Sequence, residues 1–197
     1  MNYFDCTTAT IRALVSRSHV PEDPQHAENT LTWLLTLDPA ADEALRIAAL
    51  GHDIERAVED RRIRKIDFPT FQAFKVAHAA HSAVILRNIM EGCIVPEDVI
   101  DEVCRLVRRH ETGGDPRSDL LMHADSMSFF EVNLPLYYRR NGYVKSFRRC
   151  VWGYRRLSDP LKRRVGTFTY PDSDVGRIVE KVIQDCAGPG TVPQRQE

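Results

Sequence analysis

Residues 44–56 read ALRIAALGHDIER, an alanine- and leucine-rich stretch that ends in a histidine-aspartate doublet and two charged residues. Its apolar side chains recur at the spacing of one helix face, at Ala44, Leu45, Ala48 and Ala49. This spacing predicts a buried helix. His52 and Asp53 follow at its end. Neighbouring side chains point about 100° apart on a regular helix, but at a helix end both can reach one metal ion, or the aspartate can bridge two.

Helix signals dominate the rest of the chain. Proline and aspartate mark where several helices start or stop, and a glycine-containing turn is expected at residues 112–116. We predict further helices over residues 24–37, 69–92, 96–110, 120–132 and 144–157, and a charged loop over residues 58–68. The one segment that favours a strand, 165–170, is short. The sequence therefore predicts an all-α protein.

The composition is typical of a globular domain. The chain has 197 residues, of which 43% are hydrophobic and 28% charged, and its formal net charge is −1. We expect one helical domain over residues 1–187 and a flexible tail over residues 188–197, where apolar periodicity is lacking. No stretch approaches the roughly 18 apolar residues of a membrane span, and the first twenty residues lack the pattern of a secretory signal. The sequence thus predicts a cytoplasmic protein that does not contact the membrane.

The five cysteines are scattered along the chain, at Cys6, Cys93, Cys104, Cys150 and Cys186. None forms a CxxC pair, which argues against a zinc ribbon and against thioredoxin-like redox chemistry. We expect free, mostly buried thiols in a reducing compartment.

Groups that can bind a metal ion recur on successive predicted helices. They are His26, His52, Asp53, His81, His110 and Asp125. Helices packed around one core can bring such groups together. A mixture of neutral imidazoles and carboxylates suits divalent transition metals, whereas calcium prefers oxygen ligands alone. We therefore expect these six side chains to hold one or two divalent transition-metal ions.

The order of these residues resembles the HD superfamily of metal-dependent phosphohydrolases, which is named for the histidine-aspartate doublet. Besides ALRIAALGHDIER, the resemblance rests on HAAHSAVIL at residues 78–86 and RRHETGGDPRSDLLMHADSMS at residues 108–128. In the first of these, His81 and the serine after it match the family's His-Ser pair better than His78 does. The resemblance covers about residues 20–131, and the ligand spacing is most similar to that of the symmetrical diadenosine tetraphosphate hydrolases.

The resemblance implies an HD-type helical bundle with a metal-binding core at about residues 20–131 and additional helices over residues 132–187. It also implies hydrolysis of a phosphoester or phosphoanhydride in a nucleotide or similar small molecule. The expected metal is iron or manganese, with cobalt, nickel or zinc as alternatives. Asp53 would be catalytic by bridging two ions and orienting the nucleophile, and Arg56 would be catalytic by stabilising negative charge on the phosphoryl group. We further expect substrate contacts from Arg56, Arg61, His78 and Thr112.

Two other functions stay open at this point. Some HD-type proteins with a similar ligand set hold two irons and perform oxygen-dependent oxidation. A non-catalytic role is the second alternative, because segment 139–164 carries ten basic residues against one acidic residue and could bind RNA or a partner. Oxygen consumption, phosphate release and salt-sensitive RNA binding discriminate among the three. The sequence predicts no particular oligomeric state.

Overall fold

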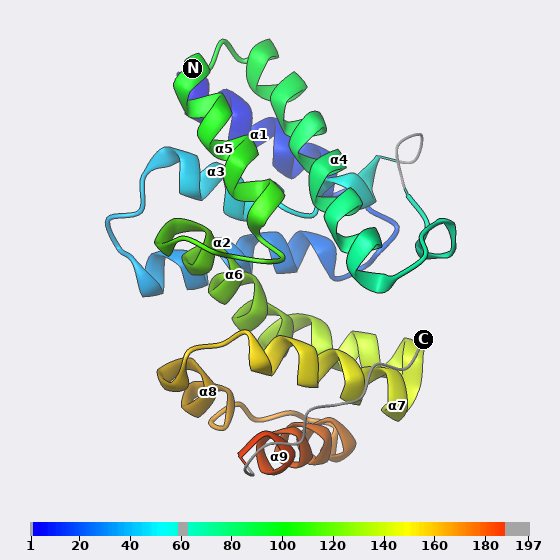
Figure 1. Ribbon diagram of the computed structural model, residues 1–197. Coiled ribbons are helices and arrows are strands. Elements are labelled where there is room, and N and C mark those ends of the chain that lie inside the picture. Colours follow the sequence, from blue (N-terminus) through cyan, green and yellow to red (C-terminus); the bar gives the residue numbers. More distant parts are fainter. Residues whose placement is uncertain (1, 59–62, 188–197) are drawn as a thin grey trace. The chain divides into compact units, whose positions relative to one another are not determined.

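The computed structural model of the protein describes residues 2–58 and 63–187, and this part of the chain contains helices and no strand (Figure 1). The α-helices are α1 (Tyr3–Val15), α2 (Asp23–Leu37), α3 (Glu43–Gly51), α4 (Phe71–Gly92), α5 (Glu97–Arg109), α6 (Pro116–Ser128), α7 (Leu134–Arg155), α8 (Asp159–Val165) and α9 (Ser173–Ala187). Two 3-10 helices, η1 (Ile54–Ala57) and η3 (Lys65–Asp67), lie between α3 and α4, and a π-helix, η4 (Phe129–Asn133), joins α6 to α7. The predicted all-α fold is confirmed.

The chain divides into two compact units, Met1–Asp125 and Ser126–Glu197. The single helical domain over residues 1–187, with a metal-binding core at about residues 20–131, stays a prediction. The predicted tail, 188–197, lies outside the described residues. Among the helices of the described ranges, none combines the length and the apolar character needed to cross a membrane.

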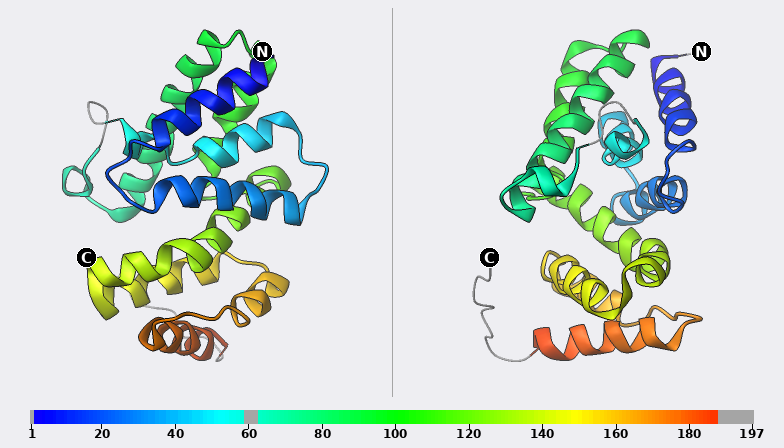
Figure 2. Two further views of the ribbon diagram at one scale, coloured as in Figure 1. Left: turned by 180° about the vertical axis from the view of Figure 1, so that it is seen from behind. Right: turned by 90° about the vertical axis from the view of Figure 1, so that its right-hand side faces the viewer.

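Helix α3 forms the centre of the first unit. Its side chains Leu45, Ile47, Ala48 and Leu50 are at most 2% exposed, because α1, α2 and α5 pack around it (Figure 2). The helix starts at a regular cap, in which the Asp42 carboxylate accepts a hydrogen bond from the Leu45 N–H. The alanine- and leucine-rich pattern thus fixes the central helix of this unit.

The end of α3 lies very close to α4. A Cβ atom on Gly51 would lie 2.5 Å from Leu86 Cδ2, well inside normal contact distance. Glycine is therefore the residue that allows this approach, since it has no Cβ atom. The approach fixes the position at which the doublet leaves the helix.

Helices α4 and α5 run side by side, as Figures 1 and 2 show. Thr70 caps α4, because its hydroxyl oxygen accepts a hydrogen bond from the Ala73 N–H. Helix α5 has acidic residues in its first turn and Arg108 and Arg109 in its last, an arrangement that complements the helix dipole. It ends directly before His110. The two helices carry metal-binding candidates to the same region of the first unit.

Helix α1 is part of the first unit, although the sequence analysis does not predict it. It packs on α3, and a disulfide joins Cys6 in α1 to Cys93 at the end of α4. The expectation that all five thiols are free is therefore wrong for this pair, because the fold brings the two Cα atoms to 5.7 Å, within the usual disulfide range. Cys104 and Cys150 are free and buried, and Cys186 is free and half-buried.

The second unit contains η4 and α7 to α9. Helix α7 packs on α9, and Gly142, with a φ of 71°, breaks α7 into two segments. Residues 165–170, which favour a strand by sequence, begin in the last turn of α8 and continue without a strand. The described residues contain no strand with which this segment could pair.

The basic segment 139–164 covers most of α7 and all of α8 except its last residue, Val165. Many of its basic side chains are exposed, but two of them pack against aromatic rings. The Arg149 guanidinium lies 4.3 Å from the Phe129 ring centre, and the Arg156 guanidinium lies 3.7 Å from the Trp152 ring centre. These two arginines make cation–π contacts, so part of the positive charge of the segment serves packing within the unit.

Candidate metal centre

The His52–Asp53 doublet lies where α3 changes into η1. His52 is the last residue with helical dihedral angles, and Asp53 follows with φ −105° and ψ 14°. This change of backbone direction removes the regular angle between the two side chains. Both side chains therefore reach the same cluster of ligating groups, as the sequence predicts for a doublet at a helix end.

The first group of potential ligands consists of His26, His52 and Asp125, and all three side chains are buried. His26 comes from α2 and Asp125 from α6. Asp125 Oδ1 lies 3.2 Å from His26 Nε2 and 3.5 Å from His52 Nε2. The two Nε2 atoms are themselves 3.2 Å apart. Two imidazole nitrogens and a carboxylate oxygen thus converge on one point, which is a donor set that could hold a metal ion.

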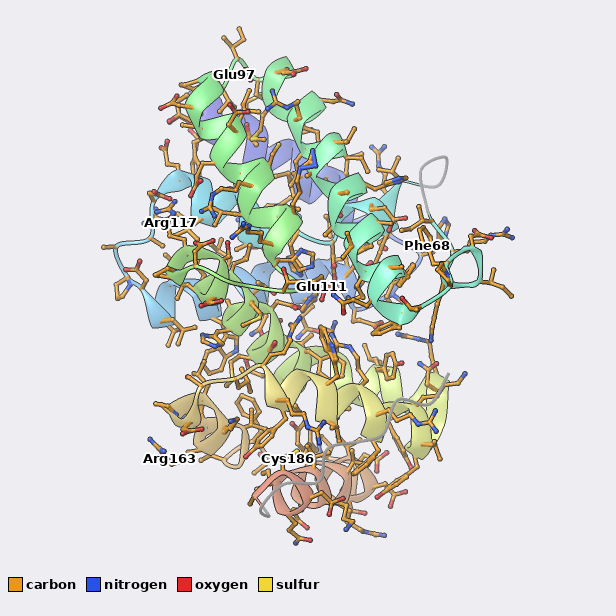
Figure 3. All side chains as sticks on the ribbon, viewed as in Figure 1. Phe68, Glu97, Glu111, Arg117, Arg163 and Cys186 are labelled. Atoms are coloured by element: carbon orange, nitrogen blue, oxygen red, sulfur yellow. A yellow bond between two sulfur atoms is a disulfide. The ribbon has the colours of Figure 1, made fainter. Side chains whose placement is uncertain are left out.

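The second group consists of Asp53, His78, His110 and Glu111. His78 comes from α4, and His110 and Glu111 directly follow α5. His78 Nε2 lies 2.7 Å from Asp53 Oδ1, and His110 Nε2 lies 3.9 Å from the same oxygen. Glu111 is buried, and Figure 3 shows it just beyond the end of α5. This group could hold a second metal ion.

Asp53 is a member of the second group, but its other carboxylate oxygen lies beside the first group. Oδ1 faces the second group, whereas Oδ2 lies 3.5 Å from His52 Nε2 and 3.7 Å from His26 Nε2. A carboxylate with one oxygen on each side is the arrangement that bridges two neighbouring metal ions.

Hydrogen bonds at Nδ1 fix the orientation of two of the imidazole rings. His52 Nδ1 lies 3.0 Å from the Ala49 carbonyl oxygen, and His110 Nδ1 lies 2.7 Å from that of Val107. In each case Nδ1 donates to the carbonyl, so Nε2 is the nitrogen that points into the cluster and that can bind a metal ion once it carries no proton. Among the described residues, His110 Nε2 is buried and has no hydrogen-bond partner. An orphaned acceptor of this kind fits a metal ligand.

The charges around Asp53 favour its ionised form. Burial alone would raise the pKa of Asp53, but the positive charges of Arg56 and His52 outweigh it and hold the pKa well below its usual value. Burial likewise lowers the pKa of His52, while Asp53 and Asp125 raise it to a net value of about 9. The doublet in the metal-free protein is thus a carboxylate beside an imidazolium, and a metal ion can take the place of the proton.

Arg56 lies at the edge of the cluster. Its Nη1 is 2.6 Å from Asp53 Oδ2 and 3.3 Å from Asp23 Oδ1, and its side chain keeps 28% of its surface exposed. The guanidinium therefore connects the bridging carboxylate with solvent. This is a suitable position for contact with an anionic ligand.

The structure does not bring His81 into either group. His81 is exposed on α4, whereas His78, one turn earlier, is buried and faces Asp53. His78 also lies 2.8 Å from Glu55 Oε2 through its Nδ1. The buried face of α4 passes through His78 and Ser82, so the histidine that the sequence analysis assigned to substrate contact occupies the place predicted for the ligand His81.

Two predicted substrate contacts differ in their outcome. Arg61 lies outside the described residues. Thr112 is exposed, and the N–H groups of Thr112 and Gly113 both donate to the Arg109 carbonyl oxygen, at 3.0 and 2.7 Å. Since these donors are used within the turn, they do not point at the cluster as free anion-binding groups.

Three buried charged residues around the cluster are absent from the sequence analysis: Glu55, Lys75 and Glu111. Lys75 forms an ion pair with Glu111, whose Oε1 lies 3.2 Å from His110 Nε2. Glu55 holds His78 from the opposite side. The adjacency of Glu111 to His110 is the one sequence signal that points to it.

Comparison with known proteins places the chain in a family. A family model described as Domain of unknown function (DUF4202) matches residues 4–176, so the chain belongs to this family. No curated protein and no solved structure matches the chain.

Proposed function

We propose that this DUF4202 protein is a metal-dependent phosphohydrolase of the HD type. The observation that carries the proposal is the placement of the Asp53 carboxylate between two histidine pairs. One oxygen lies 3.5 and 3.7 Å from the Nε2 atoms of His52 and His26, and the other lies 2.7 and 3.9 Å from those of His78 and His110. A shared carboxylate between two sets of imidazoles is typical of two-metal hydrolytic centres.

The order of the ligands along the chain supports the same function. With His78 in place of His81, the sequence of groups is His26, His52, Asp53, His78, His110 and Asp125, which keeps the order that resembles the HD superfamily. Imidazole and carboxylate donors suit divalent transition metals, and the resemblance to the HD superfamily favours iron or manganese among them. Divalent ions held there supply Lewis acidity and an activated water for attack on phosphorus.

The chain's own residues supply the remaining requirements of phosphoryl transfer. Arg56 presents a guanidinium at the edge of the cluster and can bind two phosphoryl oxygens at once. Asp53 stays ionised beside it and acts as an acceptor that orients the attacking group. The side chains of His26, His52 and His110 are at most 3% exposed. These buried side chains exclude bulk water from the reacting atoms. The proposed substrate is a small phosphorylated molecule such as a nucleotide.

Metal analysis combined with a phosphate-release panel tests the proposal. We expect protein purified without chelator to contain iron or manganese and to release phosphate from at least one phosphoester or phosphoanhydride. Asp53→Ala should lose both properties. Asp101→Ala serves as the control, because it removes an exposed aspartate of α5 that pairs with Arg87 of α4.

Three results would overturn the proposal. Phosphate release by Asp53→Ala without bound metal would remove the assigned chemistry. Oxygen uptake with an iron resonance signal and no phosphate release would indicate the di-iron oxygenase. Salt-sensitive RNA binding without turnover of any phosphoester would indicate a binding protein.

A further inference from the structure

We propose that Glu111 is a protein ligand of the second metal position and that Lys75 is its counter-ion when the metal is absent. The inference rests on the proposed metal centre and adds a residue outside the HD-like ligand order. It follows from a buried ion pair that meets the second group of ligands.

Glu111 is placed as a ligand would be. It directly follows His110 beyond the end of α5, and its side chain is 1% exposed. Its Oε1 lies 3.2 Å from His110 Nε2, the same nitrogen that has no hydrogen-bond partner among the described residues. A carboxylate oxygen of Glu111 is also one of four donor atoms that all lie within 4.8 Å of one another.

Lys75 reaches the same place from α4. It lies one turn before His78, its side chain is 6% exposed, and its ammonium group forms an ion pair with Glu111 Oε1. Burial of a lysine and a glutamate is costly, and an ion pair offsets that cost only in part. Through Glu111 this pair lies 3.2 Å from His110 Nε2 and within 4.8 Å of the donor atom of His78, so its position indicates a role in the charge of the site.

The charges at the second position explain that role. Asp53, Glu55 and Glu111 bring negative charges to this position, Arg56 pairs with Asp53, and Lys75 supplies a positive charge beside Glu111. Without a metal ion, the lysine offsets the charge of the buried Glu111 carboxylate. A divalent cation bound by Glu111 would meet the ammonium group as a like charge a few ångströms away, which weakens binding. Lys75 therefore stabilises the metal-free site and competes with the second cation.

This competition predicts opposite effects for the two partners. Removal of the Glu111 charge takes a ligand from the cation and weakens its binding. Removal of the Lys75 charge takes away a competitor and strengthens its binding. A merely structural ion pair predicts instead that both changes impair the site in the same direction, because each leaves the other buried charge without this ion pair.

Manganese titration of the full chain tests the inference. The metal-free wild type and the variants Glu111→Gln and Lys75→Gln are titrated with Mn²⁺, and bound ions per chain are counted after dialysis. Both glutamines keep a hydrogen-bonding group at the position. Glu102→Gln is the matched control, since Glu102 also pairs with basic side chains, Arg105 and Arg117, but belongs to neither ligand group.

We expect two Mn²⁺ ions in the wild type and in the control. Glu111→Gln should lower the affinity for the second ion by at least about tenfold and leave the affinity for the first unchanged. Lys75→Gln should bind the second ion more tightly. Unchanged affinity in Glu111→Gln, one ion in the wild type, or weaker binding in both variants would overturn the inference. If Lys75→Gln does not fold, Glu111→Asp takes its place. This variant keeps the negative charge but holds it on a shorter side chain, and it must lower the affinity for the second ion alone.

Failure here differs from failure of the proposed function. Binding is measured without substrate. A protein that shows these Mn²⁺ effects but hydrolyses no phosphoester would therefore support Glu111 as a ligand and contradict the proposed hydrolase function. A protein whose phosphate release needs Asp53 but whose Mn²⁺ affinity is the same in Glu111→Gln would support the hydrolase function and contradict Glu111 as a ligand.

Discussion

His78 Nε2 lies 2.7 Å from Asp53 Oδ1, although His78 lies in α4, Asp53 lies between α3 and η1, and the two are 25 positions apart in the chain. Burial lowers the pKa of His78, but its hydrogen bonds to Asp53 and Glu55 outweigh burial and raise the pKa. Each nitrogen of the ring thus faces a carboxylate oxygen, Nδ1 that of Glu55 and Nε2 that of Asp53. Nε2 is the nitrogen that would bind a metal ion at the second position.

This contact predicts a difference between two histidines on the same helix. His78→Ala should lower the affinity for the second metal ion by at least about tenfold, because it removes a buried ligand. His81→Ala should leave metal binding unchanged, because His81 is exposed and belongs to neither group. Bound metal per chain, measured by elemental analysis after dialysis, compares the two. Loss of metal in His81→Ala with full retention in His78→Ala would contradict the placement of α4.

The difficulty with His78 shows where sequence reasoning reaches its limit. The apolar pattern of residues 44–56 predicted α3, and the doublet at its end predicted a shared position for His52 and Asp53. Helix α4 also carries polar side chains on its buried face, among them Lys75 and Ser82. Hydrophobic periodicity does not register buried polar residues, so the pattern could not tell which histidine faces inward.

Helix α1 was missed for a related reason. Two of its four buried residues are threonines, Thr7 and Thr8, and their hydroxyls donate to the backbone carbonyls of Tyr3 and Phe4. Satisfied in this way, they are buried at little cost, but in the sequence they look like surface residues. Helix α9 differs from α1, because its apolar spacing is visible in the sequence. Its buried residues Val175, Ile178, Val179 and Val182 form a regular apolar face.

Removal of metal should lower the thermal stability of the protein. The cluster gathers buried carboxylates and imidazoles that a divalent ion would hold together. Binding with free metal at 100 times the dissociation constant contributes about 2.7 kcal/mol, which corresponds to a shift of roughly 5–10 °C for a chain of this size. Scanning calorimetry with and without EDTA measures the shift, and calcium-saturated EDTA is the control. An unchanged Tm would contradict a metal ion bound in the native state.

The approach of α3 to α4 gives a stability prediction that is independent of metal. Gly51→Ala should destabilise the protein by about 1–3 kcal/mol, because the new Cβ atom would overlap the buried Leu86 side chain. Gly92→Ala is the matched control, since a Cβ atom there would meet nothing within 4 Å. Urea denaturation at equal protein concentration compares the two variants. Equal stability of both would show that Leu86 moves aside without cost.

Arg56 separates metal binding from catalysis. Its guanidinium contacts Asp53 Oδ2 from the exposed edge of the cluster and is itself no metal ligand, so Arg56→Ala should keep the bound metal. The loss of a positive charge aimed at the phosphoryl group should reduce phosphate release by about 10²–10³-fold. Arg56→Lys should recover only part of the rate, because an ammonium group lacks the bidentate geometry. Arg87→Ala, which removes an arginine from surface ion pairs on α4, is the control. If Arg56→Ala loses metal together with activity, Arg56 instead positions Asp53 for metal binding. A full rate of phosphate release in Arg56→Ala would show that Arg56 has no part in the mechanism.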